Sequence, residues 1–191
     1  MAEENIFFDR NDLKYCGNNV IIGKTVRIRR PDLVSIGDNS IIDDFTYISG
    51  EVEIGKYAHI GASSSLQASG SKIIINDFSG VSSGVRVYAT SSDYLLCSFD
   101  VPTIPEEFVY GTIRLEVIFD KFVWIGANSV VHPGCNFPIG FVCGSLCKLS
   151  PQLSFKKWSI LMDSTGRMMK RMGVKKVLKQ ASLLTGEVYV L

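Results

Sequence analysis

Apolar side chains, all but one of them aliphatic, recur at every sixth position along much of the chain. These positions are Ile36, Ile42, Ile48, Ile54, Ile60 and Leu66, then Ile75, Val81 and Val87, and after a longer gap Phe119, Ile125 and Val131. A period of six fits neither a helix, with its period of about 3.6 residues, nor the alternation of a half-buried strand, with its period of about two. The pattern therefore predicts a repetitive fold built from short flat segments.

Two further periods accompany these aliphatic anchors. A turn-tolerant residue directly follows most of them, at Gly37, Asp43, Ser49, Gly55, Gly61, Asn76 and Gly126. A small or β-branched residue lies four positions after each anchor, at Ser40, Thr46, Val52, Ala58, Ser64, Ser79, Val85, Ser129 and Cys135. Together they predict a triangular coil in which each hexad forms one face and the anchors stack inside as ladders. An ordinary sandwich of short strands is the alternative, but it would alternate with period two and space its turns irregularly.

The repeat has one long interruption and an expected end. Between Val87 and Phe119 it gives way to a stretch rich in carboxylates, aromatics and prolines, and we expect a protruding loop over residues 89–117. Long insertions in compact folds are usually functional, although an arm that only stabilises an assembly is the alternative. After Val131 the segment FPIGFVCGSLCKL fits the repeat only with an insertion or deletion, so the coil is expected to end near residue 150.

The pattern divides the chain into three parts. We expect an N-terminal segment over 1–20, the coil with its loop over 21–150, and a helical tail over 151–191. Within the tail, GRMMKRMGVKKVLKQASLL indicates an amphipathic helix interrupted near Gly173. Its lysines and arginines form a solvated face or, alternatively, contact a phosphate.

Composition excludes several classes of protein. Twenty basic and nineteen acidic residues leave a net charge of +1, so no global field attracts nucleic acid or an anionic membrane. No apolar stretch is long enough for a membrane span, and the N-terminus lacks the pattern of a signal peptide. Five cysteines without a CxxC pair suit free thiols in a reducing compartment and disfavour zinc or disulfide roles. We therefore expect a cytoplasmic location.

Three segments resemble a known family. IGDNSIIDDFTYIS, IGKYAHIGASSS and IGANSVVHPG are similar to the hexapeptide-repeat acyltransferases, which include galactoside and xenobiotic O-acetyltransferases and sugar N-acyltransferases. The resemblance covers about residues 20 to 150. It implies an all-β fold, a left-handed parallel β-helix with a long protruding loop and a C-terminal α-helix. It also implies a homotrimer that uses acetyl-CoA or another acyl-CoA as cosubstrate and no metal.

The sequence of the loop indicates which class of acceptor the enzyme uses. Its segments SSDY and PTIPEEF resemble those of members that act on sugars of surface polysaccharides such as the lipopolysaccharide O-antigen. The resemblance implies a sugar or nucleotide-linked sugar acceptor, for which a dTDP-4-amino-4,6-dideoxy sugar is the specific hypothesis. The family's O-acetyltransferases place a histidine in this loop, whereas this chain has Ser91-Ser92-Asp93 there.

That difference favours an amine over a hydroxyl as the acceptor. A hydroxyl needs a base to remove its proton, whereas a neutral amine attacks a thioester without one, and the departing thiolate can take the proton. We therefore predict N-acylation, in which Asp93 accepts a hydrogen bond from the amino group and Ser83 donates to the amine or the oxyanion. Asp100, Glu106 and Tyr94 of the same loop are expected to contact the substrate.

The resemblance also implies roles outside the loop. His59 lies directly before the anchor Ile60, where side chains point outward, and relatives with Tyr-Val-His-Ile there make it a candidate base supplied to a neighbouring subunit. His132 is interpreted as structural. The coenzyme is expected to run along a groove where small residues leave room, at Gly126, Ala127, Gly144 and Ser145.

Three other functions fit the coil less well. An O-acetyltransferase would use His59 as the base in place of the missing loop histidine. A γ-class carbonic anhydrase needs three histidines around a metal, and the chain has two. A non-enzymatic trimeric scaffold is the third alternative, against which the long acidic loop argues.

Overall fold

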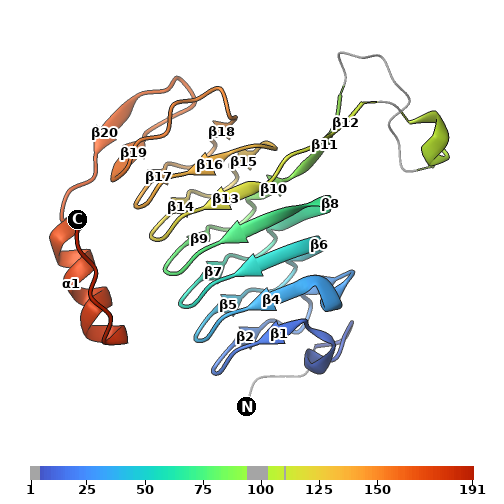
Figure 1. Ribbon diagram of the computed structural model, residues 1–191, viewed down its shortest axis with the longest axis horizontal. Helices are drawn as coiled ribbons and strands as arrows, with labels where there is room; N and C mark the ends of the chain where they lie inside the picture. The colour runs from blue at the N-terminus through green and yellow to red at the C-terminus, as the bar shows by residue number, and fades with distance from the viewer. Residues whose placement is uncertain (1–4, 94–102, 110) are drawn as a thin grey trace.

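The computed structural model describes residues 5–93, 103–109 and 111–191. Its strands wind as a left-handed parallel β-helix in which successive coils stack in chain order, as Figure 1 shows from the blue N-terminal coils to the orange C-terminal ones. The all-β coil, protruding loop and C-terminal helix predicted from the sequence are confirmed. The strands of the coils form three faces, and two long strands each contribute to two of them.

The first face is a ladder of parallel strands in chain order. It contains β2 (Ile21–Ile22), β5 (Ile41–Ile42), β7 (His59–Ile60), β9 (Gly80–Val81), β14 (Trp124–Ile125), β17 (Val142–Cys143) and β19 (Ser159–Leu161). The last strand, β20 (Met168–Lys170), pairs antiparallel with β19 and ends the ladder.

The second and third faces share two long strands that turn a corner, β6 (Tyr47–Ile54) and β8 (Ser65–Ile75). The second face adds β3 (Arg27–Ile28), β10 (Arg86–Tyr88), β15 (Val130–Val131) and β18 (Lys148–Leu149). The third face adds β1 (Tyr15–Cys16), β4 (Val34–Ile36), β13 (Val117–Phe119) and β16 (Asn136–Phe137). Short 3-10 turns precede β1 and β4, namely η1 (Arg10–Asp12) and η2 (Pro31–Leu33).

The core consists of the predicted ladders. Every aliphatic anchor and every small residue of the repeat is buried. The buried hydroxyls among them are satisfied by backbone groups of adjacent coils. Ser40 Oγ, for example, donates to the Gly55 carbonyl at 2.8 Å and accepts from the Ala58 amide at 3.0 Å. Because a buried polar group costs free energy only when it lacks a partner, serine and threonine fit these positions.

The nine-residue step between Leu66 and Ile75 has a local cause. The pairing of β6 with β8 shifts register there, since Gly50 pairs with Ala68 but Glu51 pairs with Lys72. Three extra residues of β8 therefore bulge at one corner while the anchors on both sides stay in their ladders.

The coil is longer than predicted at both ends. The expectation that the repeat needs an insertion or deletion after Val131 is wrong, because Phe137, Cys143 and Leu149 continue it in unbroken steps of six and are buried. A phenylalanine and a cysteine fill two successive anchor positions there, whereas aliphatic residues fill nearly all the others, which hid the register. The parallel ladder starts at β1 and runs to β19, beyond the predicted limits of 21 and 150.

The two appendages differ from the coil. The loop begins and ends in an antiparallel ribbon of β11 (Thr90–Ser92) and β12 (Thr112–Arg114), which projects away from the coil in Figure 1, and it contains η3 (Glu106–Phe108). The C-terminal helix α1 (Val174–Thr185) starts after Gly173, whose φ is +74°. The predicted helical turn before Gly173 is instead β20, because its backbone pairs with β19. No helix in the described part of the chain has the length and apolar character needed to cross a bilayer.

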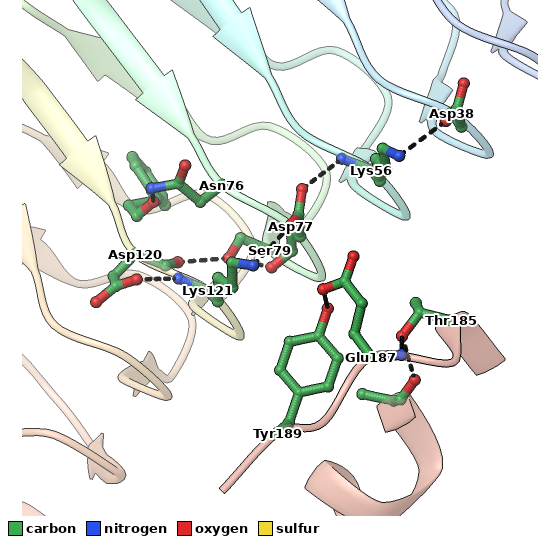
Figure 2. Close-up of polar contacts among 12 residues, drawn as sticks. Asp38, Lys56, Asn76, Asp77, Ser79, Asp120, Lys121, Thr185, Glu187 and Tyr189 are labelled. Carbon is green, nitrogen blue, oxygen red and sulfur yellow. Dashed lines mark hydrogen bonds and ion pairs between the residues drawn. The ribbon is translucent and has the colours of Figure 1, made fainter. Parts of the chain in front are cut away.

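The chain beyond α1 folds back onto one corner of the coil. The rings of Tyr57, Phe78 and Phe122 stack there with centroids 5.1 and 5.0 Å apart. Tyr189 meets the last two edge-on, and its hydroxyl donates to Glu187, as Figure 2 shows. Lys121 binds Asp77 at 3.0 Å and lies over the Tyr189 ring, so the C-terminal segment is held by both apolar and charged contacts.

Candidate functional site

A strip of small residues runs along the corner between the first and second faces. Ser83, Ala127 and Ser145, here called the small-residue corner, occupy equivalent positions in three successive coils. The Asn128 amide donates to the Ser83 carbonyl at 3.0 Å, and the Leu146 amide donates to the Ala127 carbonyl at 2.9 Å. Ser83 and Ser145 are exposed and Ala127 is half-buried. The structure therefore aligns three of the predicted site residues on one accessible edge.

Gly126 and Gly144 lie beside this corner for a packing reason. A Cβ on Gly126 would stand 2.4 Å from the backbone of Gly144, and a Cβ on Gly144 would stand 2.8 Å from the Met162 carbonyl oxygen. Their amides donate to the carbonyls of the next coil, at Cys143 and Leu161. The glycines thus let adjacent coils approach closely and keep the edge free of side chains.

His59 is paired with a carboxylate that the sequence analysis did not single out. Its Nε2 lies 2.8 Å from Oδ2 of Asp43, and the two side chains are 42% and 39% exposed. On the outer surface His59 is in register with Gly80, so no side chain stands beside it in the next coil. Asp43 occupies the turn position after its anchor, one coil before His59, and that spacing is the signal that could have found it.

The loop residues are described only in part. Asp93 follows β11, is half-buried, and its amide donates to the Gly111 carbonyl at 2.9 Å, which fixes its backbone at the end of the ribbon. Tyr94 and Asp100 lie outside the described residues. Glu106 begins η3, but its side chain is also outside the described part.

Ser83 and Asp93 belong to different corners of the coil within one chain. Ser83 lies at the turn before β10, and Asp93 lies beyond its other end, in the ribbon that leaves the corner between the second and third faces. We call this second edge the loop corner. β10 and β11 therefore lie between the two residues within one subunit, and the ribbon projects away from the coil (Figure 1).

His132 and the cysteines Cys135 and Cys143 belong to the packed coil. Burial, with a smaller contribution from Lys148, lowers the pKa of His132, and its carbonyl accepts from the Cys135 amide. Burial raises the pKa of Cys135 and of Cys143 to about 12, so both thiols are protonated at neutral pH. A protonated, buried thiol is a core residue rather than a nucleophile.

Comparison with known proteins identifies relatives of this chain. Residues 34–67 match the family model described as bacterial transferase hexapeptide (six repeats). A dTDP-4-amino-4,6-dideoxy-D-glucose acyltransferase of Escherichia coli is 34% identical over 137 residues, which are 70% of each chain. AntD, an N-acyltransferase from Bacillus cereus solved in complex with dTDP and 3-hydroxybutyryl-CoA, has a TM-score of 0.84 and 32% identity, and the match covers 95% of this chain and 98% of AntD.

More distant structures share only the architecture. A maltose O-acetyltransferase from Clostridium difficile 630 matches with a TM-score of 0.55 at 15% identity, over 85% of this chain and 71% of that one. The relatives that exceed 30% identity are therefore the informative ones, and they extend over both the coil and the loop. By its similarity to them, the chain belongs to the hexapeptide-repeat acyltransferases.

Proposed function

We propose that this enzyme transfers an acyl group from an acyl-CoA to the amino group of a dTDP-linked 4-amino-4,6-dideoxy sugar. The observation that carries the proposal is the match to AntD over 95% of the chain, because AntD is an N-acyltransferase with dTDP and 3-hydroxybutyryl-CoA bound. A variant of AntD has also been solved with dTDP-4-amino-4,6-dideoxyglucose and coenzyme A. The Escherichia coli relative has the same sugar in its name.

In the proposed reaction the amine nitrogen attacks the thioester carbonyl. The C–N bond forms, the C–S bond breaks, and the leaving thiolate takes the proton that the nitrogen loses. Asp93 accepts a hydrogen bond from the amine and orients its lone pair toward the carbonyl. The Ser83 hydroxyl donates to the oxyanion that develops on the carbonyl oxygen.

The spacing of these two residues supports their roles. Solved variants of AntD replace one serine and one aspartate that follows it by ten positions. In this chain Asp93 also follows Ser83 by ten positions.

The small-residue corner is the proposed path of the coenzyme. From Ser83 it runs past Ala127 and Gly126 to Ser145 and Gly144, toward the C-terminal coils, without a bulky side chain among these residues. A pantetheine arm is thin and largely extended, so it fits such a strip when a second surface closes over it. The thioester would then lie beside Ser83.

We further propose that a homotrimer supplies that second surface. The loop corner of one subunit would face the small-residue corner of its neighbour and bring Asp93 to Ser83 across the interface. The cytoplasm is the proposed location, since Cys135, Cys143 and Cys147 are buried free thiols that suit a reducing compartment.

Sugar O-acetylation is a second candidate, favoured by the contact between His59 and Asp43. A histidine oriented by a carboxylate is the kind of base that a hydroxyl acceptor requires.

Thiol release from acetyl-CoA separates the two. With equal concentrations of a dTDP-4-amino-4,6-dideoxy sugar and its 4-hydroxy counterpart, we expect release with the amino sugar alone, and mass spectrometry should find the acyl group on nitrogen. Release with the hydroxy sugar alone would favour O-acetylation, and release with neither would contradict the proposed function.

A further inference from the structure

A basic cavity lies at the loop corner, on the opposite side of the second face from the small-residue corner. It has a volume of about 410 Å³ and is lined by Arg29, Arg30, Leu33 and two corner glycines, Gly50 and Gly70. Both glycines have positive φ, +84° and +73°, and present bare backbone to the cavity. The cavity adjoins the start of the loop, because Thr90 Oγ1 at the base of the ribbon donates to the Ser69 carbonyl at 2.6 Å.

Two guanidinium groups line this cavity, and a third lies at its margin against Gly70. Arg29 and Arg30 follow β3, and Arg114 comes from the returning strand of the ribbon, β12. A Cβ on Gly70 would stand 2.9 Å from Arg114 Nε and 3.0 Å from its Cδ, so the arginine lies directly against this glycine. Because Gly70 lines the cavity and has no side chain, Arg114 can lie against it at the margin of the cavity.

The charges at the cavity are not neutralised by its own lining. No carboxylate is among the residues that line it. Arg30 forms two bonds to Asp32, at 2.9 and 2.8 Å, but within the described chain no ion pair involves Arg29. The carboxylates of Glu51 and Glu116 line the adjacent cavity instead.

Guanidinium groups that converge beside exposed backbone are suited to phosphate oxygens. Arginine binds phosphate through planar, paired N–H donors, and these charge-assisted bonds are stronger than neutral ones. In an acyltransferase for nucleotide sugars, two ligands contain a diphosphate, namely the coenzyme and the acceptor. Their positions along the coil distinguish them.

The coenzyme path and the basic cavity lie on opposite sides of the reaction centre. The small-residue corner runs from Ser83 toward the C-terminal coils, whereas Arg29, Gly50 and Gly70 belong to coils that precede Ser83. The cavity also adjoins the base of the loop that bears Asp93, because Ser69, one of its lining residues, accepts the bond from Thr90. We propose that Arg29, Arg30 and Arg114 bind the diphosphate of the nucleotide-linked acceptor. This inference rests on the proposed function and extends it to the subsite for the nucleotide.

Calorimetric titration of the full-length enzyme with dTDP and, separately, with coenzyme A tests the assignment. We expect Arg29→Gln and Arg114→Gln each to weaken dTDP binding by about tenfold, the loss typical of one charge-assisted bond, with coenzyme A affinity unchanged. Arg30→Gln should lose less, because Asp32 already engages that guanidinium. Arg167→Gln is the matched control, since Arg167 is an exposed arginine at the other end of the coil and should leave dTDP affinity unchanged.

Thymidine provides a second comparison because it lacks the diphosphate. The wild type should bind dTDP more tightly than thymidine, and Arg29→Gln should narrow that difference while thymidine affinity stays the same. Sedimentation of each variant checks that its assembly matches the wild type.

The outcomes separate this inference from the proposed function. If the wild type releases thiol with the amino sugar but the arginine variants bind dTDP normally, or lose coenzyme A affinity instead, the inference alone is overturned. If the wild type neither binds dTDP nor releases thiol with the amino sugar, the proposed function fails and the inference fails with it.

Discussion

Asp43 determines which nitrogen of His59 is available for chemistry. Its carboxylate lies 2.8 Å from Nε2 and accepts the proton of that nitrogen, so in the neutral ring the lone pair lies on Nδ1. A substrate proton could therefore be taken only through Nδ1. A hydroxyl needs a base to take its proton as it attacks, whereas an amine can lose its proton afterwards to the leaving thiolate, so the two acceptors give different weight to this histidine.

Replacing Asp93 should affect catalysis more than replacing His59. Asp93→Asn keeps the shape but removes the charge that orients the amine, and we expect kcat/KM to fall by roughly 10²–10⁴. His59→Asn should lower it by about tenfold or less, because the thiolate remains as a proton acceptor. Steady-state thiol release with the amino sugar measures both.

An exposed loop carboxylate serves as the control for this comparison. Glu107→Gln changes the charge of the same loop at an exposed position of η3 and should leave kcat/KM within about twofold. A strongly impaired His59 variant beside a nearly intact Asp93 variant would reverse the assignment and support general-base catalysis on a hydroxyl.

The sequence predicts the site residues that follow from their position in the hexad. It does not predict those that depend on a contact between stacked coils. Ser83 and Ala127 fall at turn positions of the hexad, so their alignment on one edge follows from the period alone. The partner of His59 lies sixteen residues earlier and becomes adjacent only when one coil stacks on the next. Gly126 and Gly144 were predicted to line the coenzyme path, which stays a prediction, and coil-to-coil contact is itself a sufficient reason for both glycines.

At the scale of the elements, short strands are stable because each is one rung of a ladder. A strand such as β7 contains two residues and could not persist alone. Its inward side chain, Ile60, stacks on the anchors of the coils above and below it and is fully buried. The energy that holds the element is thus distributed along the stack.

Truncating such an anchor should be costly. Ile60→Ala leaves a cavity that the neighbouring rungs, fixed by hydrogen bonds on both sides, cannot fill, and we expect a loss of about 2–5 kcal/mol in the free energy of unfolding. Urea denaturation measures it. Ile6→Ala, at an exposed isoleucine, should change stability by no more than about 0.5 kcal/mol. A loss below about 1 kcal/mol for Ile60→Ala would contradict the ladder.

Cys143 makes the ladder sensitive to alkaline pH. Burial raises the pKa of its thiol from 9.0 to about 12, so between these values the folded chain keeps a proton that the unfolded chain releases. The stability that this group contributes is complete below pH 9 and is lost as the pH rises toward 12. In this window the free energy of unfolding of the wild type should therefore fall more steeply with pH than that of Cys143→Ala. The difference between the two slopes should be about 1.4 kcal/mol per pH unit.

Urea unfolding at fixed protein concentration, repeated from pH 8.5 upward (roughly the pKa of a free thiol), would measure that slope. Val81→Ala removes a buried side chain from the same face but leaves Cys143 to titrate, so its slope should match the wild type. Equal slopes for wild type and Cys143→Ala would show that the thiol does not titrate differently on folding.

Anchors such as Cys143 also explain why the six-residue repeat could not be followed beyond Val131 in the sequence. A six-residue repeat is recognised by its aliphatic residues, and the last coils use Phe137 and Cys143 instead. Inside the coil these side chains fill the same ladder, and Phe137 packs on Phe141 and Phe155. Packing accepts any apolar side chain that fills the space, whereas a pattern search needs the same type.

At the scale of the whole molecule, charge is local rather than global. The net charge of +1 gave no indication of a phosphate site, because the basic residues of the loop corner are balanced by acidic residues elsewhere. Arg29 lines the cavity and Arg114 lies at its margin against Gly70, although the two are far apart in sequence, because the ribbon returns to the corner from which it left. A composition averages over the surface, so it cannot report such a cluster.

The oligomeric state of the protein is also a prediction about the whole molecule. We expect sedimentation equilibrium to give a trimer at micromolar concentration, since within a single subunit Ser83 precedes β10 and Asp93 follows β11, at different corners of the coil. A monomer that retains full activity would contradict the shared site.

Subunit complementation tests whether the two residues meet across the interface. Ser83→Ala and Asp93→Asn are each expected to be impaired alone. In trimers formed at random from an equal mixture, a site that takes Asp93 from one subunit and Ser83 from its neighbour is intact in about a quarter of cases. Co-expression of the two variants should therefore restore roughly a quarter of wild-type activity. If both residues served the same site from one chain, every site in the mixture would keep one substitution, and activity would stay at the average of the two variants.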